Sequence, residues 1–145
     1  RYGITEKPLF EYGEHGKPSL VFTTHHSPLT THHIHFNLSH CREAAICVIA
    51  QQPVGIDIES IREYKDSLAR YTMNDEELQR IASAERPDVE FTRLWTMKEA
   101  VLKCSGEGIN NDIKNVLTGW ENMETTVNLE RGYVYSVVFS GLKSK

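Results

Sequence analysis

The sequence predicts an α+β fold built from short strands and a few helices. Stretches of strand-like pattern, one before residue 60 and one after residue 122, flank a central region of helical composition. Glycine and proline interrupt the first stretch so often that only short strands fit between them. Because separate strand and helix regions are typical of α+β chains, this is the class we expect.

The first third of the chain offers short extended segments separated by loops. Leu9–Tyr12 predicts one strand, and residues 23–33, which are polar and rich in histidine, predict a loop. Residues 34–36 are expected to be extended, and residues 37–40 are expected to follow as a turn or a helix start.

Two strands are predicted near the middle of the chain. Residues 44–50 form a short apolar run, which is typical of a buried strand. Residues 54–59 alternate strictly, as a half-buried strand does. Pro53 lies between them and is the expected internal boundary, which divides the chain into residues 1–53 and 54–145.

The remaining elements are helical and then extended. Residues 64–84 have a helical composition with Asn74 as an N-cap, and residues 89–104 predict a strong helix that ends before a glycine. Strands near 125–129 and 133–139 are expected to pair as a hairpin.

Composition and charge argue against several classes of protein. Sixteen basic against twenty acidic residues give a net charge of −4, which argues against sequence-independent binding of nucleic acid as the main task. The longest apolar run, residues 44–50, is too short to span a membrane, and no secretory leader is visible. The chain opens at Arg1 without a methionine, so we expect a fragment of a longer protein.

Neither the cysteines nor the histidines predict a specific structural metal site. The three cysteines are widely spaced and form no CxxC pair, so we expect no disulfide framework or zinc knuckle, and a reducing cytoplasm. Six of the seven histidines lie between residues 25 and 40. Such a cluster can bind Zn²⁺ or Ni²⁺, but adventitious binding or plain surface exposure is the simpler interpretation.

Asp57 and Glu59 are the first candidate site residues. They stand two apart on the strand predicted at 54–59, so both carboxylates point to one face, roughly 6.6–7 Å apart along the backbone. Gly55 lies on this face, where its missing side chain leaves room for a ligand. Like charges this close favour a bound divalent ion, most plausibly Mg²⁺, and a solvated strand face is the simpler alternative.

The helix predicted at 89–104 carries charges beside its apolar stripe. Lys98 falls inside the stripe, and Glu99 and Lys103 lie one turn apart. Each has an ordinary explanation, which is snorkelling for the Lys98 ammonium and a helix ion pair for the other two. Taken with the strand carboxylates, these residues favour a site for a metal and a phosphate-bearing ligand.

Ser39 and His40 form a third candidate group. Adjacent residues rarely act as a nucleophile and its base, and no G-x-S-x-G elbow surrounds this pair. They fit better as hydrogen-bond donors to a phosphate near a helix start. Helix capping by Asn37 or Ser39 is the structural alternative.

Four motifs follow one another along the chain. They read Gly16-Lys17-Pro18, Phe36-Asn37-Leu38-Ser39-His40, Val54-Gly55-Ile56-Asp57-Ile58-Glu59 and Leu94-Trp95-Thr96-Met97-Lys98-Glu99-Ala100-Val101-Leu102-Lys103. In order and spacing this resembles the surfactin-type (Sfp-like) 4′-phosphopantetheinyl transferases, from about residue 12 to residue 117. The last two motifs are specific to that superfamily. Cys41 departs from it, because the family more often has a small hydroxyl residue there.

The resemblance implies a reaction. The 4′-phosphopantetheine arm of coenzyme A would pass to a serine of an acyl or peptidyl carrier protein, and adenosine 3′,5′-bisphosphate would leave. Asp57, Glu59 and Glu99 would hold Mg²⁺ against the pyrophosphate, and Glu99 would take the serine proton directly or through water. Asp57, Glu99 and Lys103 are thus the catalytic residues that the resemblance implies.

The same resemblance implies a set of coenzyme contacts. Lys103 would steady the phosphates, and Lys98 would do so directly or at one remove. Ser39 and His40 would contact the phosphates as well. Lys17 and Pro18 would lie along the nucleotide.

The family fold consists of two similar halves about a pseudo-twofold axis, each with a small antiparallel sheet packed on a long helix. Residues 54–145 would form a nearly complete second half, and residues 1–53 an incomplete first half on the coenzyme side. A shorter sister type, the holo-acyl-carrier-protein synthases, works as a trimer of single halves. The motif at 36–40 upstream of the motif at 54–59 favours the two-half type, while the oligomeric state stays open.

Carrier proteins are acidic around their serine, so the resemblance implies a basic and apolar docking surface. Residues just after the motif at 54–59 could supply it: Arg62, Lys65, Arg70, Tyr71 and Met73. A mixed solvated helix face is the alternative. The sequence leaves open which carrier protein is modified, and whether fatty acid, polyketide or nonribosomal peptide synthesis is served.

Two other classes remain open at this point. The carboxylates could serve two-metal hydrolysis of a nucleotide or nucleic acid, which predicts phosphate release without a carrier protein. Alternatively, a non-catalytic domain could bind coenzyme A or a carrier protein without turnover. The ordered motifs count against the first alternative, and the presence of all three proposed metal ligands counts against the second.

Overall fold

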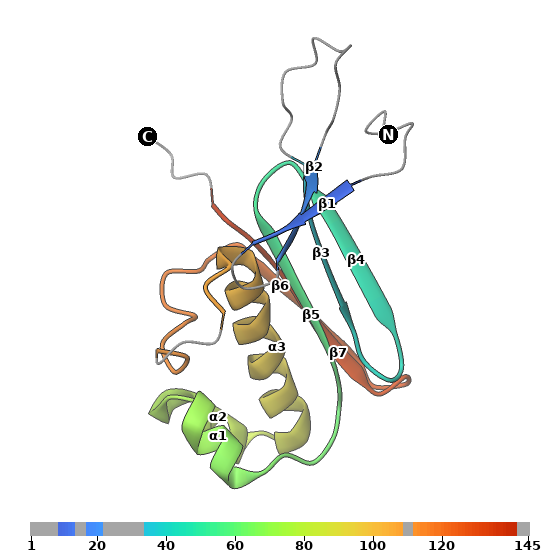
Figure 1. Cartoon of the computed structure of the whole chain (residues 1–145). Helices are drawn as coiled ribbons and strands as arrows, with labels where there is room; N and C mark the ends of the chain where they lie inside the picture. Colours follow the sequence, from blue (N-terminus) through green and yellow to red (C-terminus); the bar gives the residue numbers. More distant parts are fainter. Residues whose placement is uncertain (1–8, 14–16, 22–33, 109–111, 142–145) are drawn as a thin grey trace, which may run out of the picture.

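The computed structural model describes residues 9–13, 17–21, 34–108 and 112–141 and confirms an α+β fold (Figure 1). The histidine-rich stretch at 23–33 lies outside the described residues. In chain order the elements are β1 (Leu9–Tyr12), β2 (Pro18–Val21), β3 (His35–His40), β4 (Ala45–Ala50), β5 (Val54–Ser60), α1 (Asp66–Thr72), α2 (Asp75–Ser83), α3 (Pro87–Ser105), β6 (Met123–Asn128) and β7 (Tyr133–Phe139).

All strand pairs in the described segments are antiparallel. β1 pairs with β2, β3 pairs with β4, and a three-stranded sheet has the order β5-β7-β6. The predicted hairpin near the C-terminus is confirmed as β6 and β7. By register, Gly55, Asp57 and Glu59 of β5 share one face of this sheet with Val138, Ser136 and Val134 of β7.

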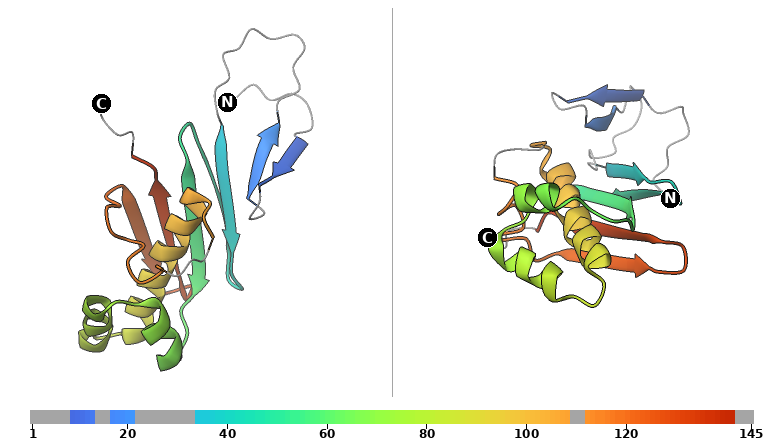
Figure 2. Two further views of the ribbon diagram at one scale, coloured as in Figure 1. Left: turned by 60° about the vertical axis from the view of Figure 1, so that its left-hand side comes forward. Right: turned by 90° about the horizontal axis from the view of Figure 1, so that it is seen from below.

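α3 covers that face of the sheet (Figures 1 and 2). Its ends follow from local chemistry: Pro87 opens it, and Gly106 ends it in the left-handed conformation with φ 79°. The C-terminal half of α3 packs on β7 through Ala100, Val101, Cys104 and Val138. This packing brings Lys103 Nζ to 2.7 Å from Asp57 Oδ1 of β5, and the Asp57 charge raises the pKa of Glu99.

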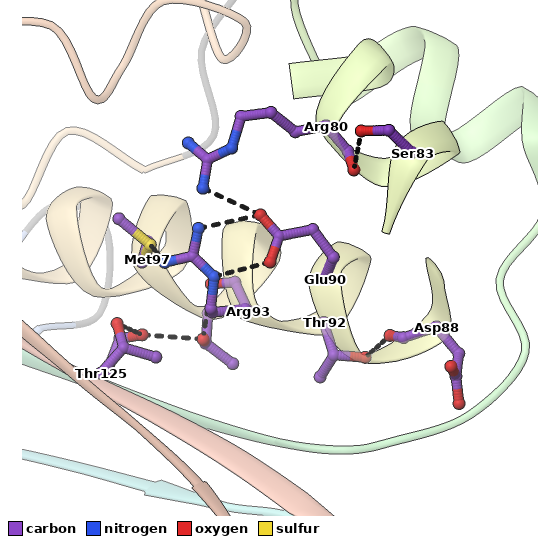
Figure 3. A network of polar contacts seen from close by, with 10 residues as sticks. Arg80, Ser83, Asp88, Glu90, Thr92, Arg93, Met97 and Thr125 are labelled. Atoms are coloured by element: carbon purple, nitrogen blue, oxygen red, sulfur yellow. Dashed lines mark hydrogen bonds and ion pairs between the residues drawn. The ribbon is translucent and has the colours of Figure 1, made fainter. Parts of the chain in front are cut away.

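α1 and α2 pack against the N-terminal half of α3. The predicted cap at Asn74 is confirmed as a capping box, in which Asn74 Oδ1 accepts from the Glu77 N–H and Glu77 Oε2 accepts from the Asn74 N–H. The rings of Tyr64 and Phe91 stack with centroids 4.4 Å apart. At the surface, Glu90 accepts hydrogen bonds from Arg80 of α2 and Arg93 of α3 (Figure 3).

Three expectations about strands are corrected by the structure. Residues 37–40 belong to β3 rather than to a turn or helix start, because they pair in antiparallel register with residues 45–48 of β4. β4 is not a buried strand, since every second residue is exposed. β5 is buried on both faces from Val54 to Ile58, not half-buried, because α3 covers the face that the alternation left open to solvent.

The cysteine and membrane expectations can also be compared with the structure. Cys41, Cys47 and Cys104 are all free thiols, as their spacing predicts. In the described part of the chain, none of the helices has the length and apolar character needed to cross a membrane.

Gly55 makes room for a helix, not for a ligand as the sequence suggested. A Cβ atom at this position would lie 2.6 Å from the Cys104 backbone nitrogen and would collide with the Ala100 carbonyl. Because both obstacles are backbone, Gly55→Ala is expected to push α3 off β5 and to lower the free energy of unfolding by about 1–3 kcal/mol or more. Urea denaturation measures this. Gly13→Ala is the control, because its Cβ would meet only an ordinary contact at 3.7 Å; an equal cost for both variants would contradict the close approach.

Candidate active site

Asp57 lies where β3, β5 and α3 meet. Its residue is 4% exposed, and its Oδ1 atom accepts a hydrogen bond of 2.7 Å from Lys103 Nζ on α3. The same atom accepts from Ser39 Oγ on β3 at 2.9 Å. Asp57 is therefore not part of a solvated strand face, which was the simpler alternative.

Ser39 has further contacts in this group. Its Oγ atom accepts from Lys103 Nζ at 3.0 Å and from the Ile58 N–H at 3.4 Å. One step back along β3, Asn37 Oδ1 accepts from the Ile56 N–H at 3.0 Å. Among the described strands no backbone ladder joins β3 to β5, so these two side chains satisfy the N–H groups at the edge of β5.

The second carboxylate oxygen of Asp57 has no partner. Within the described residues, Asp57 Oδ2 is the buried side-chain oxygen or nitrogen that lacks a hydrogen bond. Leaving a charged group's oxygen buried and unpaired is costly, so such an atom points to a ligand that completes it.

Glu59 and Glu99 lie in the same electrostatic environment as Asp57. Burial raises the pKa of Glu59, and the Asp57 charge raises it further. The positive charges of Arg62 and Lys103 oppose the rise, as does a hydrogen bond from Trp95. Burial likewise raises the pKa of Glu99, again reinforced by Asp57, with Lys103 opposing and Glu59 adding to the rise. The charge of Asp57 therefore disfavours the ionised forms of both Glu59 and Glu99, and a cation between the carboxylates would relieve this.

The donor set fits Mg²⁺. This ion prefers oxygen ligands and is usually held by one or two carboxylates, with substrate phosphates and water completing its shell. Across the described segments, no three His, Cys, Asp or Glu side chains are gathered closely enough to hold a metal ion by themselves. The unpaired Asp57 Oδ2 is available as one carboxylate ligand, and Glu59 and Glu99 lie close enough for the Asp57 charge to raise the pKa of each.

Lys98 is placed apart from these carboxylates. Its side chain is 0% exposed, and Nζ lies 2.9 Å from Glu77 Oε2 and 2.9 Å from each of the carbonyl oxygens of Ile113 and Lys114. An ammonium has three donors, and three partners use all of them. The snorkelling alternative is therefore wrong, and the described contacts give Lys98 no free donor for a phosphate.

Lys17 and Pro18 line a cleft of about 440 Å³ beside the C-terminal end of α3. Ile34, the first residues of β3 and Gly106 also line this cleft. Lys17 Nζ donates to the Cys104 carbonyl at 2.9 Å, which ties β2 to this end of α3. His40 is exposed at the end of β3, and Ser39 beside it is buried, so the two residues point to opposite faces of the strand.

Four of the five residues proposed for carrier docking are exposed in the structure, and the fifth is buried. Arg62, Lys65, Arg70 and Tyr71 are exposed around α1, and Tyr71 is among the exposed large hydrophobic residues. Met73 is 0% exposed and packs in the core with Ala69, Ile81, Phe91 and Leu94, so its placement on a docking surface is wrong. It follows α1 directly and faces α3 instead of solvent.

Sequence reasoning missed two contributors to this region. Asn37 anchors β3 to β5, and Glu77 receives the Lys98 ammonium. For Asn37 the available signal was the alternation of two polar residues, Asn37 and Ser39, with Leu38 on the other face. For Glu77 the capping pattern explained the residue completely, so nothing in the sequence pointed to a second partner.

Comparison with known proteins adds an independent observation. A family model described as the 4′-phosphopantetheinyl transferase superfamily matches residues 53–141, which is more than half of the chain. This range includes β5, α3 and all three carboxylates.

Curated relatives bear similar names. The chain is 38% identical over 106 residues to 4′-phosphopantetheinyl transferase gsp of Aneurinibacillus migulanus, covering 72% of this chain and 40% of the relative. It is 41% identical over 78 residues to 4′-phosphopantetheinyl transferase psf-1 of Bacillus pumilus, covering 52% and 34%. It is 38% identical over 105 residues to 4′-phosphopantetheinyl transferase HetI of Nostoc sp., covering 69% and 42%. The chain thus spans less than half the length of each.

Proposed function

Because the chain belongs to the 4′-phosphopantetheinyl transferase superfamily, we propose that it transfers the 4′-phosphopantetheine arm of coenzyme A to a serine of an acyl or peptidyl carrier protein. The observation that carries this proposal is the buried, unpaired Asp57 Oδ2 beside Glu59, Glu99 and Lys103. These residues come from β5 and α3, which lie inside the segment that matches the family.

The bond changes of the proposed transfer balance. The serine Oγ attacks the phosphorus next to the pantetheine arm, and the bond from that phosphorus to the bridging oxygen of the pyrophosphate breaks. Adenosine 3′,5′-bisphosphate leaves with that oxygen and its electron pair. The serine proton goes to Glu99, directly or through water.

Asp57, Glu59 and Glu99 would hold the Mg²⁺ ion jointly with phosphate oxygens of the coenzyme and with water, because within the described part of the chain these three carboxylates do not form a site by themselves. The ion would polarise the attacked phosphorus and neutralise charge on the pyrophosphate. Lys103 is within reach of the same phosphates, since its ammonium already lies 2.7 Å from Asp57 Oδ1 and needs only to share its donors. Together these groups supply positive charge where the leaving group develops negative charge.

The coenzyme and the carrier protein are proposed to bind to different parts of the chain. The cleft beside Lys17 and Pro18 has room for part of a nucleotide and provides an ammonium for a phosphate. The exposed Arg62, Lys65, Arg70 and Tyr71 offer a basic and aromatic surface for an acidic carrier protein. Arg62 also lowers the pKa of Glu59 through its charge, which supports a docking surface close to the carboxylates. The three free cysteines fit a cytoplasmic location.

Release of adenosine 3′,5′-bisphosphate tests the reaction class. The chain is incubated with coenzyme A and MgCl₂, with and without an apo carrier protein, and the nucleotide products are separated by chromatography. The proposal expects release only when the carrier is present. Release without a carrier would favour hydrolysis, and coenzyme binding without any release would favour a non-catalytic binding domain.

A further inference from the structure

β3 runs beside β5 in the same direction and is joined to it by side chains. Asn37 Oδ1 accepts from the Ile56 N–H at 3.0 Å, and Ser39 Oγ accepts from the Ile58 N–H at 3.4 Å. Each strand advances by two residues between these contacts, so the two strands are parallel. Because no backbone pairing joins them among the described strands, the side-chain oxygens take the place that carbonyl groups occupy in a parallel sheet.

The two strands joined in this way carry different parts of the proposed site. β3 carries Ser39 and His40, which the family resemblance implies as contacts of the coenzyme phosphates. β5 carries Asp57, directly after the Ile56 N–H that Asn37 holds. Since a strand rises about 3.3 Å per residue, a slip of β3 along β5 by even part of a residue would shift the phosphate contacts against the carboxylates. A misplacement of about 1 Å can lower a reaction rate by on the order of 10²-fold.

Asn37 is the contact that can hold this register while a ligand binds. The residue is 7% exposed, and its hydrogen bond to the β5 backbone involves no group of the proposed site. The Ser39 hydroxyl, in contrast, is shared between the β5 backbone, Lys103 and Asp57. A phosphate that recruits Ser39 and Lys103 would redirect the hydrogen bonds of this hydroxyl and would leave the Asn37 bond in place.

We propose that Asn37 is a positioning residue, which couples coenzyme binding on β3 to metal binding on β5 by keeping the two strands in register. This inference rests on the proposed function, because it takes Ser39 and His40 as coenzyme contacts and Asp57 as a metal ligand. Two ligands coupled in this way raise the affinity for each other by the same factor. Loss of the Asn37 bond should reduce that factor, because a metal–coenzyme complex that spans both strands would then have to align them itself.

The test measures this coupling factor without turnover. Coenzyme A affinity is measured by calorimetry in excess MgCl₂ and again in excess EDTA, with no carrier protein present, and the ratio of the two dissociation constants is the coupling factor. Asn37→Ala is expected to reduce the factor by about 2–30-fold relative to the wild type. A variant that was merely less stable would have a lower melting temperature and an unchanged factor.

Matched variants separate the oxygen of Asn37 from a general loss of packing. Asn37→Ser differs from Asn37→Ala by one oxygen atom, and Ser39 shows that a serine hydroxyl on β3 can accept from the β5 backbone. Asn37→Ser should therefore keep more of the coupling factor than Asn37→Ala. Thr92→Val removes a buried hydroxyl that donates to the Asp88 carbonyl within α3, and it should leave the factor within about twofold (Figure 3).

The possible results overturn different statements. If Asn37→Ala keeps the wild-type factor, or if Asn37→Ser loses as much of it as Asn37→Ala, the positioning role is wrong. If Asn37→Ala does not fold, Asn37→Ser is compared with the wild type, and an unchanged factor again overturns the role, because the shorter serine should hold β3 less tightly. If MgCl₂ does not change the coenzyme affinity of the wild type, the proposed metal site itself is wrong, and the inference falls with it.

Discussion

Replacing Lys98 by methionine is expected to lower the free energy of unfolding by about 3–5 kcal/mol, because it breaks a fully buried ion pair by removing one partner. Glu77 would keep a buried carboxylate without its cation, and the carbonyl oxygens of Ile113 and Lys114 would lose their donor. Urea denaturation followed by circular dichroism measures the loss.

An exposed ion pair provides the matched control. Arg80→Met removes the cation of the Arg80–Glu90 pair, whose arginine side chain is largely exposed, and should cost less than about 1 kcal/mol (Figure 3). Adding Glu77→Gln to Lys98→Met should recover part of the loss, since a neutral amide needs no cation. If Lys98→Met instead left stability unchanged and raised KM for coenzyme A, Lys98 would be the coenzyme ligand that the resemblance implied.

Replacing Glu99 by glutamine is expected to affect activity and stability in opposite directions. Loss of the proposed proton acceptor should lower the transfer rate by about 10²–10⁴-fold. Without metal at pH 7.5 the same change should raise the melting temperature, because it removes a negative charge that burial and Asp57 disfavour. A transfer assay and a thermal melt in EDTA measure the two effects.

The pH dependence of this stabilisation has a definite sign. A carboxyl group whose pKa is raised on folding holds its proton more tightly in the folded state, so stability falls as pH rises from the usual value of 4.5 through the raised pKa. The advantage of Glu99→Gln over the wild type should therefore be largest at neutral pH and should shrink toward pH 4.5. Mg²⁺ with coenzyme A should also reduce it, by stabilising the wild type more.

A melting temperature of Glu99→Gln equal to or below that of the wild type at pH 7.5 would contradict this reading of the site. The matched control is Glu124→Gln, which neutralises an exposed carboxylate on β6 and should leave both the transfer rate and the melting temperature nearly unchanged.

Local signals in the sequence were sufficient for α2, α3 and the C-terminal hairpin, whereas the region 64–84 was not divided into α1 and α2. Pro87 and Gly106 limit α3, and Asn74 caps α2, through contacts made within a few residues of chain. The period-2 placement of Asp57 and Glu59 put both carboxylates on one face of β5, which is the face that α3 covers. The hydrophobic periodicity of the strand and the helix was therefore enough to suggest that the strand carboxylates and the helix charges belong to one site.

The parts that sequence reasoning missed depend on partners far along the chain. β3 has polar residues on its inner face because the N–H groups of Ile56 and Ile58 need acceptors, a demand that local pattern does not reveal. Met73 is buried because α3 packs over it. Lys98 can be buried because its ammonium pairs with Glu77 and donates to two backbone carbonyl groups. From the sequence, the space left by the missing side chain of Gly55 could be filled either by a ligand or by a packed helix. The structure shows that the backbone of α3 fills it.

Intact-mass spectrometry of an apo carrier protein tests the proposed reaction most directly. The carrier is incubated with this chain, coenzyme A and Mg²⁺, beside a reaction with chelator and one with Asp57→Asn. We expect the carrier to gain the mass of one phosphopantetheine in the first reaction and none in the other two. No gain on any of several apo carrier proteins, or an equal gain in the presence of chelator, would contradict a metal-dependent transferase centred on Asp57.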